Sequence, residues 1–330
     1  MSLRLLAVHA HPDDESSKGA ATYAYYVNRG VSVTVVSCTG GERGDIQNDT
    51  LEKHAMANRD MAGLRYREMA AAAAHIGCDH RWLGYLDSGL PDEGESVPAN
   101  SFAVVPLESS AAPLVKIIRE LRPQVVHTYD QSGGYPHPDH IRTHEITVYA
   151  IAAAADPTRY PDAGAPWSVS KLYYDRIFNP DRMAAVYNRL VETEPDSERT
   201  AHMAEMQEWM KDRPVVSPAT SQVSAADYFE TRDNALRAHA SQVAPHSRFF
   251  FLPNDLQRDV WPYEDYELAW SLVPITLPES DLFAGIDDHE AGVVVGPPQP
   301  QDQSRSTAHN QSLKQDQSLE QPQSLEQDQA

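Results

Sequence analysis

Apolar positions in the first 160 residues fall into two kinds of segment. Nearly continuous apolar runs, typical of parallel strands buried on both faces, occupy 3–10, 31–38 and 125–129. Segments with the apolar period of a helix occupy 16–29, 59–76, 114–121 and 143–155. Strands separated by helices of this length require right-handed crossovers. The pattern therefore predicts an α/β fold with a Rossmann-like, doubly wound, mostly parallel sheet.

The part of the chain after residue 156 is richer in Pro, Trp and Tyr. Its pattern predicts a strand at 170–178 and helices at 181–192 and 225–241. We expect this part to complete the sheet and to form a smaller C-terminal cap. One domain over 1–290 would then have its sheet core at about 1–180 and its cap region at about 181–290.

The segment 291–330 is dominated by Gln, Asp, Ser and Pro, and the triplet Gln-Ser-Leu recurs every six residues from 311. Such a composition buries too little apolar area to offset the entropy lost on ordering. We therefore predict a disordered Gln-rich low-complexity tail. A partner-binding peptide or a weak helix is the alternative.

Charge narrows the range of partners. The 330 residues include 27 Lys+Arg and 48 Asp+Glu, a formal net charge of −21, which disfavours binding to nucleic acid or to anionic membranes. No apolar stretch approaches the roughly 18 residues of a membrane helix, and the first apolar run is short for a signal peptide, so we expect a cytoplasmic protein. Only Cys38 and Cys78 are present. Two cysteines in a chain of this length argue against a disulfide framework and against a Cys-based zinc site.

Ligands of open parallel sheets bind at the carboxyl ends of the strands. The first strand is followed by His11, Pro12, Asp13, Asp14 and Glu15. A dinucleotide-binding fold would have a glycine-rich turn at this place, whereas three acids repel phosphate and attract a cation. In the simpler alternative, Asp13 or Asp14 only caps the following helix.

A second segment of the same type follows the strand that ends at Tyr129 and contains His137, Pro138, Asp139 and His140. Imidazole and carboxylate together suit Zn²⁺, and three protein ligands with an open position are typical of catalytic zinc. Two histidines and a carboxylate also fit non-haem iron. The additional carboxylates favour hydrolysis, because the attacking water needs a base. His144, four residues after His140 on a helix, is a competing ligand.

Two segments carry a resemblance to a known family, 10–15 (AHPDDE) and 134–140 (GYPHPDH). They resemble the signature motifs of the LmbE-like (PIG-L) zinc N-deacetylase superfamily. Other segments resemble its mycothiol S-conjugate amidase branch, at 8–20, 39–44, 86–91, 169–174 and 235–240. The resemblance covers about 1–287, is loose at 193–222 and does not extend into the Gln-rich tail.

The resemblance implies a metal site formed by His11, Asp14 and His140, with Zn²⁺ as the ion and Fe²⁺ as the alternative. It implies that Asp13 is the general base. It also implies that His137, oriented by Asp139, stabilises the oxyanion and protonates the leaving amine, with assistance from Tyr135. Tyr135 has an alternative reading as a loop aromatic that packs on the cap.

Substrate contacts implied by the resemblance are Lys18, Glu42, Arg65 and Asp87. Each of the last three has a simpler alternative: loop surface for Glu42, a solvated helix position for Arg65 and a turn cap for Asp87. His127 and His239 are expected to be structural.

The activity implied is that of a metal-dependent amide hydrolase with a small-molecule substrate. The expected bond is the amide between the cysteinyl group and glucosaminyl-inositol of mycothiol S-conjugates, cleaved in thiol detoxification or in trimming of a mycothiol-derived biosynthetic intermediate. The alternative enzyme is a deacetylase of N-acetylglucosaminyl-inositol or of another acetyl sugar. A non-catalytic binding module is a third possibility, which the intact Asp13 and His137 disfavour because a binder needs neither.

Overall fold

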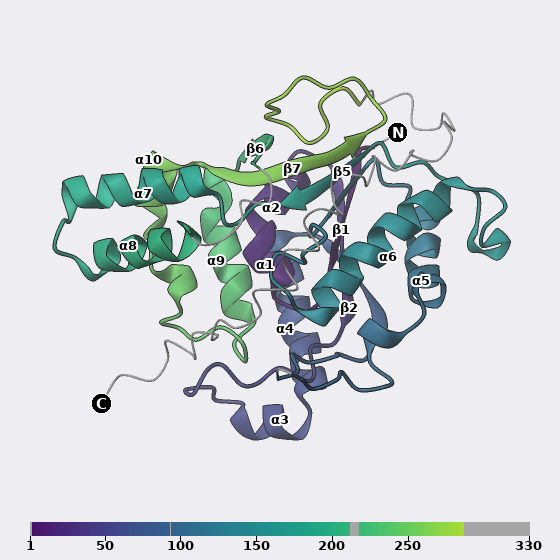
Figure 1. Ribbon diagram of the computed structural model, residues 1–330, viewed down its shortest axis with the longest axis horizontal. Helices are drawn as coiled ribbons and strands as arrows, with labels where there is room; N and C mark the ends of the chain where they lie inside the picture. Colours follow the sequence, from purple (N-terminus) through teal and green to yellow (C-terminus); the bar gives the residue numbers. More distant parts are fainter. Residues whose placement is uncertain (1, 93, 212–217, 287–330) are drawn as a thin grey trace. The chain divides into compact units, whose positions relative to one another are not determined.

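A computed structural model describes residues 2–92, 94–211 and 218–286. Its centre is a seven-stranded sheet of order β3-β2-β1-β4-β5-β7-β6 (Figure 1). The first five strands in this order are parallel, and β7 is antiparallel to both of its neighbours, β5 and β6. The strands are β1 (Arg4–His9), β2 (Ser32–Thr39), β3 (Asp79–Tyr85), β4 (Val125–Thr128), β5 (Lys171–Asp175), β6 (Ser221–Ser224) and β7 (Tyr263–Ser271). The predicted doubly wound, mostly parallel α/β fold is confirmed.

Helices connect the strands and cover the sheet. They are α1 (Asp14–Lys18), α2 (Ala20–Val27), α3 (His54–Arg59), α4 (Met61–Ile76), α5 (Leu107–Leu121), α6 (Pro138–Ala155), α7 (Pro180–Thr193), α8 (Glu198–Lys211), α9 (Phe229–Ala238) and α10 (Asn254–Val260). None of these described helices has both the length and the apolar character needed to cross a membrane.

Both faces of the sheet are buried, as the continuous apolar runs predict. Leu5 and Ala7 of β1 pack in a core with residues of α2, α4 and α9. The alternate residues Leu6 and Val8 pack in a second core with residues of α5 and α6. Because side chains alternate along a strand, one apolar strand supplies both cores.

The predicted helix at 16–29 is two helices, interrupted at Gly19. A Cβ at Gly19 would lie 2.5 Å from the Tyr23 ring. The Tyr23 hydroxyl contacts ring nitrogens of His9 and His127 at 2.9 and 2.6 Å. The buried tyrosine therefore crosses the backbone of the preceding turn, and only a residue without a side chain fits there.

Other boundaries differ in ways that the local sequence explains. The helix predicted at 59–76 corresponds to α4, which begins two residues later, at Met61, because the Asp60 side chain accepts a hydrogen bond from the Gly63 N–H and caps the helix. The helix predicted at 114–121 begins at Leu107. Strand β3 is not among the predicted elements, because its partly exposed, polar sequence lacks a continuous apolar run.

The region after residue 180 contributes to the sheet as well as to the helical layer, as its strands β6 and β7 show. The predicted elements at 170–178, 181–192 and 225–241 correspond to β5, α7 and α9. The tail predicted at 291–330 lies outside the described residues.

Candidate active site

The site lies where the order of strands along the sheet reverses, between neighbouring parallel strands β1 and β4. The loop after β1 carries His11 and leads into α1, which begins with Asp14. The loop after β4 leads into α6, which carries His140 in its first turn. The carboxyl ends of these two strands thus bring both His-Pro-Asp segments to one place.

Asp14 lies between two imidazoles. Its Oδ2 atom is 3.6 Å from Nδ1 of His11 and 3.4 Å from Nε2 of His140. These three buried residues can place one ligand atom each within 4.8 Å of one another, a spacing that could hold a metal ion. Burial opposes the ionised form of Asp14, but Lys18 and the nearby histidines lower its pKa well below the usual value, so it is a carboxylate.

The tautomer of His140 fits a metal ligand. Its Nδ1–H donates to the Gly133 carbonyl at 2.9 Å, whereas its buried Nε2 has no hydrogen-bond partner. An unpartnered buried acceptor is costly unless something binds it. Gly133 has φ +75°, and a Cβ there would lie 2.7 Å from Cβ of His140, so this close approach requires glycine.

The competing ligand His144 has a different place. Its Nδ1 lies 3.0 Å from the Tyr129 carbonyl and its ring lies 5.4 Å from the Tyr174 ring. It belongs to neither group of described residues that could hold a metal ion. The second such group is His11, His137 and Asp139, so the two groups share His11.

Asp139 contacts His11 rather than His137 through its carboxylate. Its Oδ2 accepts from Nε2–H of His11 at 3.2 Å and from the Ser88 N–H at 2.9 Å, and its Oδ1 accepts from the Ser88 hydroxyl. Burial lowers the pKa of His11, but hydrogen bonds to Asp139 and Asp87 outweigh it and raise that pKa to about 10. Carboxylates that hold a proton on His11 in this way also suit a cation.

His137 is the N-cap of α6, with Pro138 as the first helical residue. Its Nδ1 accepts the Asp139 N–H at 3.1 Å, so the neutral ring carries its proton on Nε2. Burial and the neighbouring His11 lower the pKa of His137 to about 4. The ring is therefore neutral near pH 7 and offers Nε2–H as a hydrogen-bond donor.

Asp13 precedes α1, but its side chain makes no capping hydrogen bond. Its Oδ2 lies 2.9 Å from a guanidinium nitrogen of Arg65, and its φ of 109° is unusual for a residue with a side chain. Burial raises the pKa of Asp13, against the opposing effect of Arg65. The carboxylate is 27% exposed and belongs to neither metal-capable group, so it is separate from the ligand cluster.

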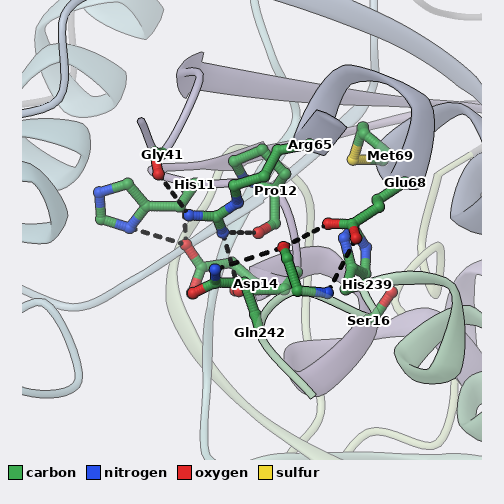
Figure 2. A network of polar contacts seen from close by, with 12 residues as sticks. His11, Pro12, Asp14, Ser16, Gly41, Arg65, Glu68, Met69, His239 and Gln242 are labelled. Atoms are coloured by element: carbon green, nitrogen blue, oxygen red, sulfur yellow. Dashed lines mark hydrogen bonds and ion pairs between the residues drawn. The ribbon is translucent and has the colours of Figure 1, made fainter. Parts of the chain in front are cut away.

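Arg65 is buried beneath the loop rather than solvated on its helix. Its guanidinium donates to the Pro12 carbonyl and, at 2.7 Å, to the Gly41 carbonyl (Figure 2). The guanidinium also donates to the Asp13 carboxylate, so Arg65 joins the loop that contains Pro12 and Asp13 to the loop that contains Gly41. The residue therefore fixes the loop that carries the site.

The other three residues expected to contact substrate also surround the loop. Lys18, with an 8% exposed side chain, donates to Oδ1 of Asp14 at 2.5 Å. Asp87 accepts from the backbone N–H groups of Arg43 and Gly89. Oε1 of Glu42 accepts the Asp87 N–H at 2.8 Å. Glu42 and Asp87 therefore hold each other, Lys18 holds Asp14, and a role of these residues in substrate binding stays a prediction.

Tyr135 lies over the imidazoles. Its ring centroid is 4.5 Å from that of His140 and 5.9 Å from that of His137, and the side chain is 41% exposed. Burial and the nearby Asp14 raise the pKa of its hydroxyl, so it remains a donor. The Tyr135 ring thus packs against two imidazoles of the site, those of His137 and His140.

Sequence reasoning missed two pairs that support the loop. Glu15 pairs with His239 at 2.8 Å, and the carboxylate of Glu68 on α4 accepts from the N–H and hydroxyl of Ser241. Both pairs tie the end of α9 to the site. Glu15 and His239 lie in segments that carry the family resemblance, which was the available signal, whereas Glu68 and Ser241 lie in none. Partners so distant in sequence leave no local pattern.

Comparisons with known proteins identify the family. The family described as PIG-L: GlcNAc-PI de-N-acetylase matches residues 6–151. The chain is 47% identical over 292 residues to a mycothiol S-conjugate amidase of Streptomyces coelicolor, covering 87% of this chain and 98% of that protein. It is 40% identical over 293 residues to a 1D-myo-inositol 2-acetamido-2-deoxy-alpha-D-glucopyranoside deacetylase of Streptomyces griseus, covering 86% and 89%.

Solved structures share the fold at low identity. The N,N'-diacetylchitobiose deacetylase of Pyrococcus horikoshii is 19% identical, with a TM-score of 0.50 over 80% of this chain and 83% of that one. The conserved protein TT1542 of Thermus thermophilus is 21% identical, with a TM-score of 0.50 over 83% and 97%.

Proposed function

The chain belongs to the PIG-L family of de-N-acetylases and is an amide hydrolase, and from this premise we propose that it hydrolyses mycothiol S-conjugates. The bond cleaved is the amide between the cysteinyl group and glucosaminyl-inositol. The observation that carries the proposal is the 47% identity to a mycothiol S-conjugate amidase over 98% of that protein. Detoxification of thiol conjugates, or trimming of a biosynthetic intermediate, is its role. The cytoplasmic location expected from the sequence stays a prediction.

His11, Asp14 and His140 are the proposed ligands of a zinc ion. Three features support this set: the spacing of the ligand atoms, the ionised Asp14 and the unpartnered Nε2 of His140. Imidazole and carboxylate donors suit Zn²⁺ and also Fe²⁺. Elemental analysis of the purified protein distinguishes the two ions.

The bound metal would supply Lewis acidity for the attacking water and the amide carbonyl. Asp13 accepts the proton of the water, because its carboxylate is separate from the ligand cluster and burial raises its pKa. Arg65 holds Asp13 in place through their ion pair. His137 donates a hydrogen bond from Nε2–H to the developing oxyanion and stays neutral, because its Nδ1 accepts the Asp139 N–H. The leaving amine receives the proton that Asp13 took from the water, and His137 orients that amine.

Asp139 and Tyr135 complete the proposed catalytic group. Through its carboxylate, Asp139 fixes the ring of His11, and through its backbone N–H it fixes the tautomer of His137. Tyr135, close to the His137 ring, supplies a second hydroxyl donor toward the oxyanion. Glu42, Arg65 and Asp87 surround the place of the sugar-inositol group and act mainly by holding the loops that contact it. Lys18, bound to Asp14, contacts the conjugate beside the metal site.

A deacetylase acting on N-acetylglucosaminyl-inositol is the second candidate, supported by the 40% identity to the Streptomyces griseus protein. It would use the same ligands and base on a smaller acyl group. Mass spectrometry of the products from both substrates, incubated in parallel, tests the choice. We expect kcat/KM for the conjugate to exceed that for the acetylated sugar at least about tenfold. Equal values, or a preference for acetyl, would replace the amidase proposal with the deacetylase.

A further inference from the structure

A pocket of about 370 Å³ lies beside the loop that carries the site. Its walls come from α7, α8, α9 and α10, from the start of β7, from the segment 247–252 and from the residues that follow β5. Lys18 belongs to both places, because it lines this pocket and also donates to Asp14 at 2.5 Å. The side chain of Lys18 therefore connects the pocket to Asp14, one of the residues of the metal-capable group.

The lining is rich in flexible sulfur-containing and aromatic side chains. Met183 comes from α7, and Met203 and Met206 come from α8. Phe178 and Phe249 belong to the same lining although their side chains are 43% and 53% exposed. Methionine adapts its shape to irregular apolar groups, and apolar pockets of this size hold small molecules.

Two charged side chains in the same walls, Arg232 and Asp265, are already hydrogen-bonded to neighbouring residues. The guanidinium of Arg232 donates to Asp233, Asn254 and Gln257. Asp265 accepts from Gln222 and Trp261. A sugar or an inositol would need several hydrogen-bonding groups from its pocket, whereas Arg232 and Asp265 already have partners and the methionine and aromatic side chains offer none. The lining thus favours an apolar ligand.

We propose that this pocket binds the apolar S-substituent of a thiol conjugate. The inference rests on the proposed function, in which the scissile carbonyl belongs to an S-substituted cysteine. The sulfur of cysteine is only three bonds from its carbonyl carbon, so the substituent must leave the metal site on the acyl side. Because Lys18 both lines the pocket and contacts Asp14, the apolar pocket begins close to the metal site, where a substituent on the cysteine sulfur can reach it. The consequence is selectivity for bulky apolar substituents over small or charged ones.

Binding of a substrate fragment tests the pocket without turnover. The probe is the amide of S-(naphthylmethyl)-N-acetylcysteine, titrated into the metal-loaded full chain and followed by ligand-observed NMR. In Met206→Trp the larger side chain fills the pocket, and we expect Kd to rise at least about tenfold. The matched control is Met210→Trp on the same helix, outside the lining, for which we expect Kd within about twofold of the unaltered chain.

A second variant guards against misfolding. Phe249→Ser replaces an exposed side chain, so the fold should persist, and it should also weaken binding of the probe. Unchanged affinity in both Met206→Trp and Phe249→Ser would overturn the proposal. So would equal affinity of the unaltered chain for the S-methyl analogue.

Hydrolysis of complete conjugates separates this inference from the proposed function. We expect the ratio of kcat/KM for S-naphthylmethyl over S-methyl conjugates to fall at least about fivefold in Met206→Trp and to persist in Met210→Trp. An unaltered chain that hydrolyses neither conjugate would contradict the proposed function, while the binding titration still decides the pocket. Turnover of both conjugates at equal rates would reject the pocket and leave the amidase standing.

Discussion

The carboxylate of Glu15 and the imidazole of His239 form an ion pair of 2.8 Å in which both side chains are fully buried, although 224 residues separate them. The second carboxylate oxygen of Glu15 accepts the Asp13 N–H at 2.9 Å. Burial opposes the charged forms, but the pairing lowers the pKa of Glu15 to about 2 and raises that of His239. The end of α9 therefore holds the backbone of the proposed base.

Replacing His239 should reduce both stability and turnover. His239→Ala leaves a buried carboxylate unpaired, which costs about 3–5 kcal/mol of the free energy of unfolding. His239→Gln keeps a hydrogen-bond donor and should recover part of the melting temperature. Thermal melts, metal content and kcat measure these effects, with exposed His75→Ala as the control. A His239→Ala variant as stable and active as the unaltered chain would show that the pair has no such role.

The ligand assignment predicts loss of metal and activity together. His140→Ala removes one of three proposed ligands, and two ligands hold zinc poorly. His144→Ala, one helical turn away, should keep both because His144 belongs to neither metal-capable group. Elemental analysis of the two variants distinguishes them. Full occupancy in His140→Ala, with loss in His144→Ala, would transfer the role to His144.

Asp13→Asn separates the base from the ligands. The amide keeps the shape and tolerates the positive φ, but it does not accept the proton of the water. We expect near-normal metal content and turnover reduced by roughly 10²–10⁴. Asp79→Asn at the exposed start of β3 is the control. Loss of metal would instead make Asp13 a ligand, and full activity would remove its catalytic role.

The buried carboxyl group of Asp175 leads us to expect that the stability of the fold depends on pH. Burial raises its pKa to about 7, its Oδ2 has no hydrogen-bond partner, and the charged groups around it are Lys18, Arg176, Asp130 and Asp14. A carboxyl with a raised folded-state pKa stays protonated in the folded chain at acidic pH, and the free energy of unfolding falls as pH rises through about 7.

The test is Asp175→Asn, which removes the ionisation. Its melting temperature should exceed that of the unaltered chain at about pH 8 by more than at about pH 5. Asp162→Asn, on an exposed turn, should show no such difference. A melting-temperature gain that is the same at both pH values would contradict the raised pKa.

Truncation after Asp288 tests the proposed domain boundary. We expect the melting temperature and kcat to remain within error, because a low-complexity segment contributes little buried apolar area. A marked loss of either would show that the removed residues belong to the domain.

The local sequence was sufficient to predict the candidate site where the polar residues directly follow a recognisable strand. Both His-Pro-Asp segments lie directly after strands whose apolar runs are continuous, so their meeting at one end of the sheet followed from the parallel topology. Strand β3 lacked such a run and was missed. Distant side-chain partners were also beyond reach, as the pairs of Glu15 with His239 and of Glu68 with Ser241 show.

The orientation of individual side chains needed the structure. Lys18 was expected to contact substrate, and the structure adds that its ammonium contacts Asp14 while the residue also lines the pocket. For Arg65, expected as a substrate contact, the alternative was a solvated helix position, yet its guanidinium is buried against two backbone carbonyls. The spacing of residues along a helix predicts which face of the helix a side chain lies on, but it does not predict which loop packs against that face.

The adjacency of β1 and β4 makes the ligand set non-local. Leu5 pairs with Val125 in the register of these strands, so His11 and His140 meet only after a segment of more than a hundred residues has folded between them. A metal ion bound by residues of both loops would bind the folded chain, because the unfolded chain does not bring these ligands together. Its binding free energy would then add to the free energy of unfolding. Metal supplied during synthesis would then govern the yield of intact protein and its resistance to proteases, before any substrate is present.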